Sequence, residues 1–121
     1  MGLFQRIFGK PQSDSMTFTQ GKTFRGFKKI GIVSHGNKEA EAGLKKLCGA
    51  NLEGKTIKIK RTDYGYAIYV DNIRIGSVFP GTSAASVALE ALEHGNISEA
   101  FIKIDKLADN TIVGSLFVKI A

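Results

Sequence analysis

Apolar and polar residues alternate along several short stretches of the chain, and a period of two is the spacing of a β-strand with one buried face. The clearest example is residues 55–80, where Lys and Ile alternate before a Tyr-rich loop, a tight hairpin and a Gly-Ser-Val-Phe-Pro exit. The pattern predicts strands at residues 27–33, 55–61, 66–70, 73–79, 98–106 and 111–120.

Two other segments carry apolar residues at helical spacing. Residues 37–48 have Asn37 as a plausible N-cap and Gly49 as the terminator, and residues 83–94 are followed by Gly95. The apolar faces contain Ala40, Leu44, Leu47 and Cys48 in the first helix and Ala85, Ala88, Leu89 and Leu92 in the second. Since 121 residues can close one core, we expect one small α+β domain, mostly antiparallel and β-barrel-like, with two helices.

The dipeptide Asp71-Asn72 tolerates the left-handed conformation that a two-residue hairpin needs. This hairpin pairs Val70 with Ile73, Tyr69 with Arg74 and Ile68 with Ile75. The apolar members then share the buried face, while Tyr69 and Arg74 share the other. By the same alternation we expect Tyr66 in the core near Ser77. Tyr64 falls at the entrance of the strand, where the ladder ends, so we expect it at the rim.

The first 22 residues differ from the rest. Residues 1–10 place apolar side chains on one helical stripe, and the polar stretch that follows indicates a linker or a loosely held edge strand. We therefore expect an amphipathic segment and linker at residues 1–22 and a compact domain at residues 23–121. Residues 1–10 could fold back onto the domain, fray, or contact a membrane surface or partner protein.

The formal charge of +6 is unevenly placed. Residues 1–61 hold 13 Lys and Arg against 4 Asp and Glu, whereas residues 62–121 hold 4 against 7. This asymmetry suggests an anionic partner for the first half, either nucleic acid or a phospholipid surface, although solubilising lysines give a similar pattern.

Several classes of protein are not indicated. One cysteine and two histidines cannot form an internal disulfide or a zinc site made from Cys and His. Without a long apolar run or a secretory signal, we expect a cytoplasmic protein. Residues 49–56, GANLEGKT, match the phosphate-binding loop pattern, but a helix precedes them and a strand follows, the reverse of the required order. We therefore expect neither NTP hydrolysis nor other catalysis, and no cofactor.

Lys58 and Lys60 face away from the buried Ile57 and Ile59 on their strand. A basic strand beside an exposed tyrosine is typical of proteins that track a single-stranded backbone and stack its bases, although solvated edge lysines look similar. In this interpretation Lys58, Lys60 and Arg61 meet phosphates, Tyr64 stacks a base, and Tyr69 with Arg74 extends the track.

The order of elements, with GLKKLCGANLEG, TIKIKRT, AIYVDNIRIGSVFP and SAASVALEALEHGN, resembles the HIRAN domain. HIRAN domains are small β-barrel modules with helices, found in replication-repair remodelers and as standalone bacterial proteins. The resemblance covers about residues 25–120, and its best part is the spacing of Ala67, Ile68, Ile75, Gly76 and Pro80.

The resemblance implies binding of single-stranded DNA ends or unusual DNA structures. The family's loop carries an Asn-Pro, an aromatic followed by an acid, and an Asn before the Ala-Ile. This chain has RTDYGY there, so the acid and aromatic are reversed as Asp63 and Tyr64. The chain therefore resembles a divergent, standalone bacterial type of the family. In this loop Asp63 could accept a hydrogen bond from a sugar hydroxyl.

The sequence therefore predicts a non-enzymatic module for nucleic acid, either single-stranded DNA or DNA ends. The predicted binding residues are Lys58, Lys60, Arg61, Asp63, Tyr64, Tyr69 and Arg74. The alternative is a protein-interaction or membrane-surface adaptor that works through residues 1–10. Neither interpretation involves a metal or a small-molecule substrate.

Overall fold

The computed structural model describes residues 15–80 and 86–121. The elements, in chain order, are β1 (Ser15–Thr19), β2 (Lys28–Ile32), α1 (Lys38–Leu47), β3 (Thr56–Arg61), β4 (Tyr66–Val70), β5 (Ile73–Val78), α2 (Ser86–Glu93), β6 (Ile97–Lys106) and β7 (Ile112–Ile120). The expected small α+β domain with antiparallel sheets and two helices is confirmed within this described part. The predicted start of the second helix, residues 83–85, lies outside the described residues.

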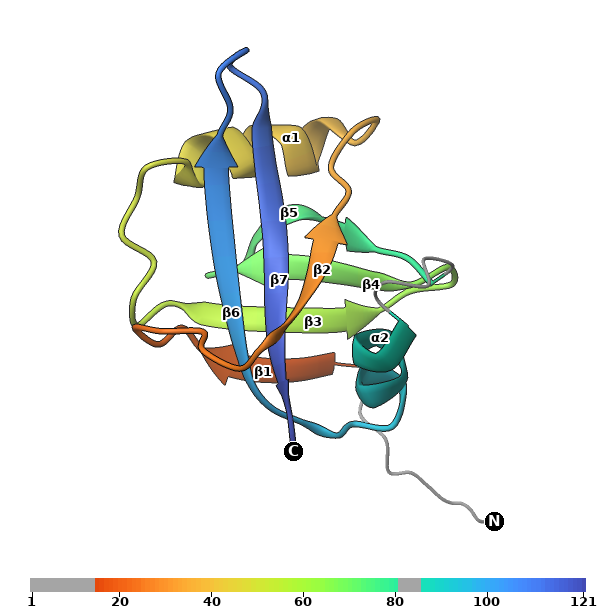
Figure 1. The fold of residues 1–121 in the computed structure, drawn as a ribbon. Helices are drawn as coiled ribbons and strands as arrows, with labels where there is room; N and C mark the ends of the chain where they lie inside the picture. Colours follow the sequence, from red (N-terminus) through yellow and green to blue (C-terminus); the bar gives the residue numbers. More distant parts are fainter. Residues whose placement is uncertain (1–14, 81–85) are drawn as a thin grey trace.

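The strands form two antiparallel sheets, ordered β1-β3-β4-β5 and β2-β7-β6. In Figure 1 the strands of the second sheet cross in front of those of the first, and α1 lies at one end of both sheets. The inner faces bury a shared apolar core, in which the largest fully buried side chains are Ile57, Ile59, Ile68, Val70, Ile75, Val78, Ile102, Leu116 and Val118. This arrangement leaves the opposite face of each sheet available to carry polar side chains.

Local sequence signals account for the ends of α1 and for the central hairpin. The side-chain oxygen of Asn37 accepts a hydrogen bond from the Ala40 N–H at 2.9 Å, as an N-cap does, and Gly49 follows the helix with φ +83°. Asp71 and Asn72 have φ values of 49° and 69°, so the expected two-residue hairpin is confirmed. Among the described residues, neither helix has the length and apolar character needed to cross a membrane.

Two contacts join the edges of the sheets. Val33, just after β2, exchanges backbone hydrogen bonds of 2.7 and 2.9 Å with Ser77 of β5. At the opposite edge, the buried Gln20 amide donates to the Ile102 carbonyl at 2.9 Å and accepts from the Ile102 N–H at 2.8 Å. The Gln20 side chain thus makes the two backbone hydrogen bonds with Ile102 that a neighbouring strand would otherwise make.

The register of β4 with β5 corrects part of the predicted hairpin. Val70 faces Ile73 and Tyr69 faces Arg74 as expected, but Ile68 faces Gly76 instead of Ile75 because the ladder shifts between Ile68 and Tyr69. Tyr66 consequently faces Val78, with Ser77 one position away.

The glycine at position 76 explains where β5 bends. Gly76 has φ +148°, and a Cβ there would lie 2.4 Å from Ile32 and 2.7 Å from the Val33 carbonyl oxygen. Only glycine allows the backbone of β5 to approach the end of β2 this closely, and the approach permits the Val33–Ser77 pairing.

The start of the folded part also needs correction. β1 pairs with β3 from Ser15 to Thr19, and Met16 and Phe18 pack against the core. The fold therefore begins before residue 23, and of the two interpretations of this stretch the edge strand is the one that the structure supports. The amphipathic residues 1–10 lie outside the described part of the chain.

Candidate nucleic-acid interface

Three predicted binding residues lie together on the outward face of β3 and β4. Lys58 is directly opposite Tyr69 in the antiparallel pair, and Lys60 is opposite Ala67. With Asn72 from the hairpin, Lys58, Lys60 and Tyr69 line a shallow pocket of about 190 Å³. The strand alternation therefore gathers two ammonium groups and one aromatic ring at a single place.

Arg74 continues this row onto the next strand, because it faces Tyr69 from β5. Its Nη2 donates a hydrogen bond to the Ser77 hydroxyl at 3.1 Å, whereas its Nε is buried and has no hydrogen-bond partner among the described residues. A buried donor without an acceptor is costly. We call the group formed by Lys58, Lys60, Tyr69 and Arg74 the cationic row.

The cationic row keeps its positive charge. Among the described residues, neither Lys58 nor Lys60 pairs with an acidic side chain. The neighbouring acid, Asp71, is held by the Thr56 N–H at 2.9 Å and by the Lys55 ammonium at 3.4 Å. The backbone hydrogen bond from Thr56, followed by Lys55, lowers the pKa of Asp71, so this carboxylate stays charged but engaged elsewhere.

The bend between β3 and β4 carries two further predicted residues, Asp63 and Tyr64. Thr62 and Gly65 close this bend, with the Thr62 N–H bonded to the Gly65 carbonyl at 2.8 Å and the Gly65 N–H to the Thr62 hydroxyl at 3.1 Å. Tyr64 is 80% exposed, which confirms its rim position, and Asp63 is also exposed. An aromatic ring and a carboxylate are therefore open to solvent at the end of the basic strand.

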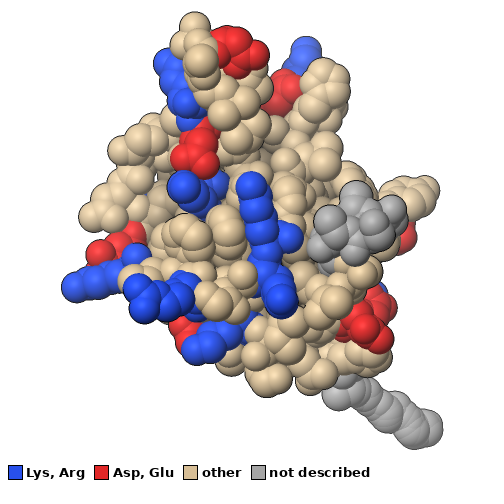
Figure 2. Space-filling model, viewed as in Figure 1, with Lys and Arg blue, Asp and Glu red and all other residues tan. Residues whose placement is uncertain are grey.

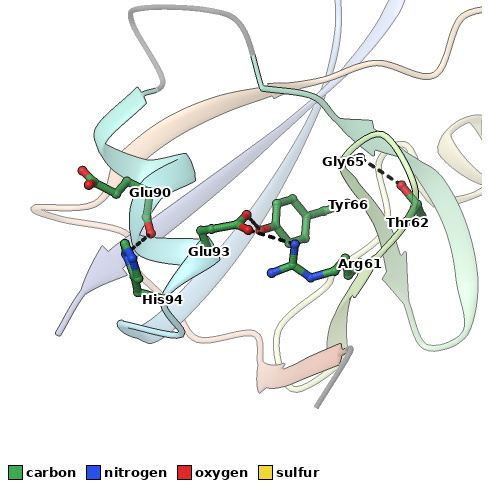
Figure 3. A network of polar contacts seen from close by, with 7 residues as sticks. All are labelled: Arg61, Thr62, Gly65, Tyr66, Glu90, Glu93 and His94. Carbon is green, nitrogen blue, oxygen red and sulfur yellow. Dashed lines mark hydrogen bonds and ion pairs between the residues drawn. The ribbon is translucent and has the colours of Figure 1, made fainter. Parts of the chain in front are cut away.

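Arg61 does not join the lysines. Figure 3 shows it directed toward Glu93 of α2, and its Nη1 lies 3.0 Å from a Glu93 oxygen. Its guanidinium also lies 5.4 Å from the centre of the Tyr66 ring, the residue opposite it on β4. Strand alternation explains the difference, since Arg61 has the parity of Ile57 and Ile59, whereas the lysines have the other.

Tyr66 is buried at 5% exposure, as predicted, and its hydroxyl donates to the other Glu93 oxygen at 2.6 Å. Burial, followed by this hydrogen bond, raises the pKa of Tyr66 to about 12. The hydrogen bond from Tyr66, followed by that from Arg61, lowers the pKa of Glu93. The hydrogen bond and the ion pair among these three side chains attach α2 to the β3–β4 hairpin (Figure 3).

The contacts of Glu93 with Tyr66 and Arg61 predict that the domain loses stability in acid. Because the pKa of Glu93 is lower in the folded than in the unfolded protein, its contribution is present above the unfolded pKa and is lost as the pH falls through the folded pKa. We expect Glu93→Gln to make stability less dependent on pH below about 5, as measured by urea unfolding at a series of pH values. Glu90→Gln, an exposed change on the same helix, serves as the control and should keep the wild-type slope. Equal slopes for both variants would contradict the assignment.

Other chemistry receives little support from the described residues. In residues 15–80 and 86–121 no group of three or more His, Cys, Asp or Glu could hold a metal ion. The lysine of the GANLEGKT segment, Lys55, pairs with Asp71 at the start of β3. It therefore lacks the position at a helix N-terminus that a phosphate-binding loop requires.

Comparisons of the chain with models of protein families, with curated proteins and with solved structures found no match. Any assignment of function therefore depends on the geometry described above.

Proposed function

We propose that this protein binds nucleic acid, as single-stranded DNA or DNA ends, without catalysing a reaction. The observation that carries the proposal is the cationic row, in which Lys58, Tyr69 and Arg74 follow one another across three adjacent strands. Lys58 and Lys60, which pair with no acid in residues 15–80 and 86–121, attract phosphates, and an aromatic ring beside them offers a surface on which a base can stack.

Each predicted residue has a role in this proposal. Lys58 and Lys60 contact successive phosphates, Tyr69 stacks a base, and the Arg74 guanidinium adds positive charge beside this ring. Tyr64 adds a second stacking surface, and Asp63 accepts from a sugar hydroxyl. Arg61 is reassigned from phosphate binding to the attachment of α2, because Glu93 already balances its charge.

The fold is part of the same proposal. We interpret the two sheets as a partly open barrel of the HIRAN type, since the Val33–Ser77 and Gln20–Ile102 contacts join both pairs of sheet edges. We expect such a module to act in the cytoplasm and to need no cofactor. The adaptor alternative depends on residues 1–10, for which the described part of the chain offers no observation.

A salt series tests the proposal. We expect a short labelled single strand to bind more tightly than a duplex of the same sequence. If the three cations Lys58, Lys60 and Arg74 each neutralise one phosphate, log K should fall against log salt with a slope of about −2. Fluorescence anisotropy measures both quantities.

Absence of oligonucleotide binding at low salt, together with liposome binding that disappears when residues 1–10 are deleted, would favour the adaptor instead.

A further inference from the structure

A cavity of about 620 Å³ lies on the side of the domain away from the β3–β4 bend. Three chain segments line it: residues 20–22 after β1, the connection from α1 to β3, and residues 101–104 of β6. Figure 1 shows this connection running down beside β6. The volume lies within the range typical of sites for small organic ligands.

Two lysines from different segments line the cavity, Lys22 after β1 and Lys103 on β6. Both are exposed, and neither forms an ion pair with an acid among the described residues. Figure 2 shows Lys and Arg side chains gathered on the face that carries β6, β7 and β2. Two unpaired ammonium groups at one cavity favour an anionic ligand, and a phosphate group accepts from both.

An aromatic surface adjoins these cations. Phe101 lines the cavity and packs on Phe24, with ring centres 4.8 Å apart, and the Lys103 ammonium lies 5.9 Å from the centre of the Phe24 ring. Phe101 is only partly buried, so one part of its surface remains available to a planar ligand. A phosphate site next to a partly exposed ring matches the two ends of a nucleotide.

The third wall is the glycine-containing connection from α1 to β3. Gly49 lines the cavity, and a Cβ built on it would meet nothing within 4 Å. Asn51 and Glu53 supply an amide and a carboxylate on the same wall, groups that can bind ribose hydroxyls or an exocyclic amine. The carboxylate also repels ligands of high negative charge. It therefore favours a monophosphate over a triphosphate.

We propose that this cavity binds a nucleoside monophosphate, with the phosphate on Lys22 and Lys103 and the base against Phe101. The site is separate from the cationic row, since Lys58, Lys60 and Tyr69 line a different pocket. It also gives the GANLEGKT segment a binding role without hydrolysis, since residues 49–53 line the cavity whereas Lys55 does not.

Two-dimensional NMR of the ¹⁵N-labelled full chain, titrated with AMP, adenosine and inorganic phosphate, tests the inference. We expect AMP to shift the amides of Gly49, Ala50, Asn51 and Lys103, and to bind at least about tenfold more tightly than adenosine or phosphate alone, because it engages both the cations and the ring. The double variant Lys22→Ala/Lys103→Ala should weaken AMP binding by about tenfold or more, since charged hydrogen bonds are lost.

The control is Lys58→Ala/Lys60→Ala, which removes the same charge from the cationic row and should leave AMP binding unchanged. The inference is overturned if the amides of residues 49–51 do not move, if phosphate binds as tightly as AMP, or if the control variant abolishes the shifts. A short single strand that displaces AMP would indicate a nucleotide within a strand as the natural ligand, and no displacement would indicate a free nucleotide. Because the oligonucleotide titrations probe the other pair of lysines, either proposal can fail without the other.

Discussion

Replacing Lys58 and Lys60 together by Ala should weaken single-stranded DNA binding roughly 60-fold at about 50 mM salt and about 10-fold at about 200 mM. The loss follows from the counterions that two phosphate contacts release, each of which contributes about 0.7 to the slope of log K against log salt. The slope itself should therefore decrease by about 1.4. Anisotropy titrations of the same oligonucleotide at several salt concentrations measure both changes.

The control for this experiment has the same change in net charge elsewhere on the surface. Lys38→Ala/Lys106→Ala removes two exposed lysines, one at the start of α1 and one at the end of β6. We expect it to retain nearly the full salt slope. If both double variants weaken binding equally, the interaction depends on overall charge, and the cationic row is not the binding site.

Gln20→Leu should destabilise the domain by about 3 kcal/mol, because it leaves the N–H and the C=O of Ile102 without partners inside the protein. Gln20 is only 5% exposed, so water cannot readily replace the lost amide. Urea unfolding followed by circular dichroism gives the change in the free energy of unfolding. Thr19→Val, at the exposed neighbouring position, should change stability by less than about 0.5 kcal/mol.

Gln20→Glu distinguishes the donating half of this contact from the accepting half. An ionised carboxylate accepts from the Ile102 N–H but cannot donate to the Ile102 carbonyl, whereas a protonated one does both. Burial raises the pKa of a carboxyl, so the deficit of this variant relative to wild type should narrow as the pH falls. A deficit that is independent of pH, or a Gln20→Leu variant as stable as wild type, would show that the amide does not hold the two sheet edges together.

The strands and the hairpin could be predicted from the sequence because their signals are local. Alternation of Ile and Lys defines β3, and Asp71-Asn72 defines the turn after β4. Burial of Tyr66 followed from the same alternation, whereas the rim position of Tyr64 followed from its place before the start of the strand. Applied one residue further, this alternation would also have separated Arg61 from Lys58 and Lys60.

Other features depend on residues distant in sequence and could not be predicted. Nothing near Arg61 in the chain points to Glu93, which lies 32 residues away on a helix. The shifted pairing places Gly76 against Ile32 and Val33, more than 40 residues earlier in the chain, and the contact from Gln20 to Ile102 spans 82 residues. The 620 Å³ cavity likewise combines three separate segments, so its two lysines resemble ordinary surface charges in the sequence.

Gly43 has a consequence for the path that a bound strand can follow. A Cβ at this position would collide with the Arg74 carbonyl oxygen, so α1 rests directly on the backbone of β5. The helix therefore lies against β5, the strand on which the row that runs from Lys58 through Tyr69 to Arg74 ends. In the proposed complex, a strand that follows this row across β3, β4 and β5 would reach the helix at the last of them. Such an arrangement would suit a chain terminus better than the middle of a long, uninterrupted polymer.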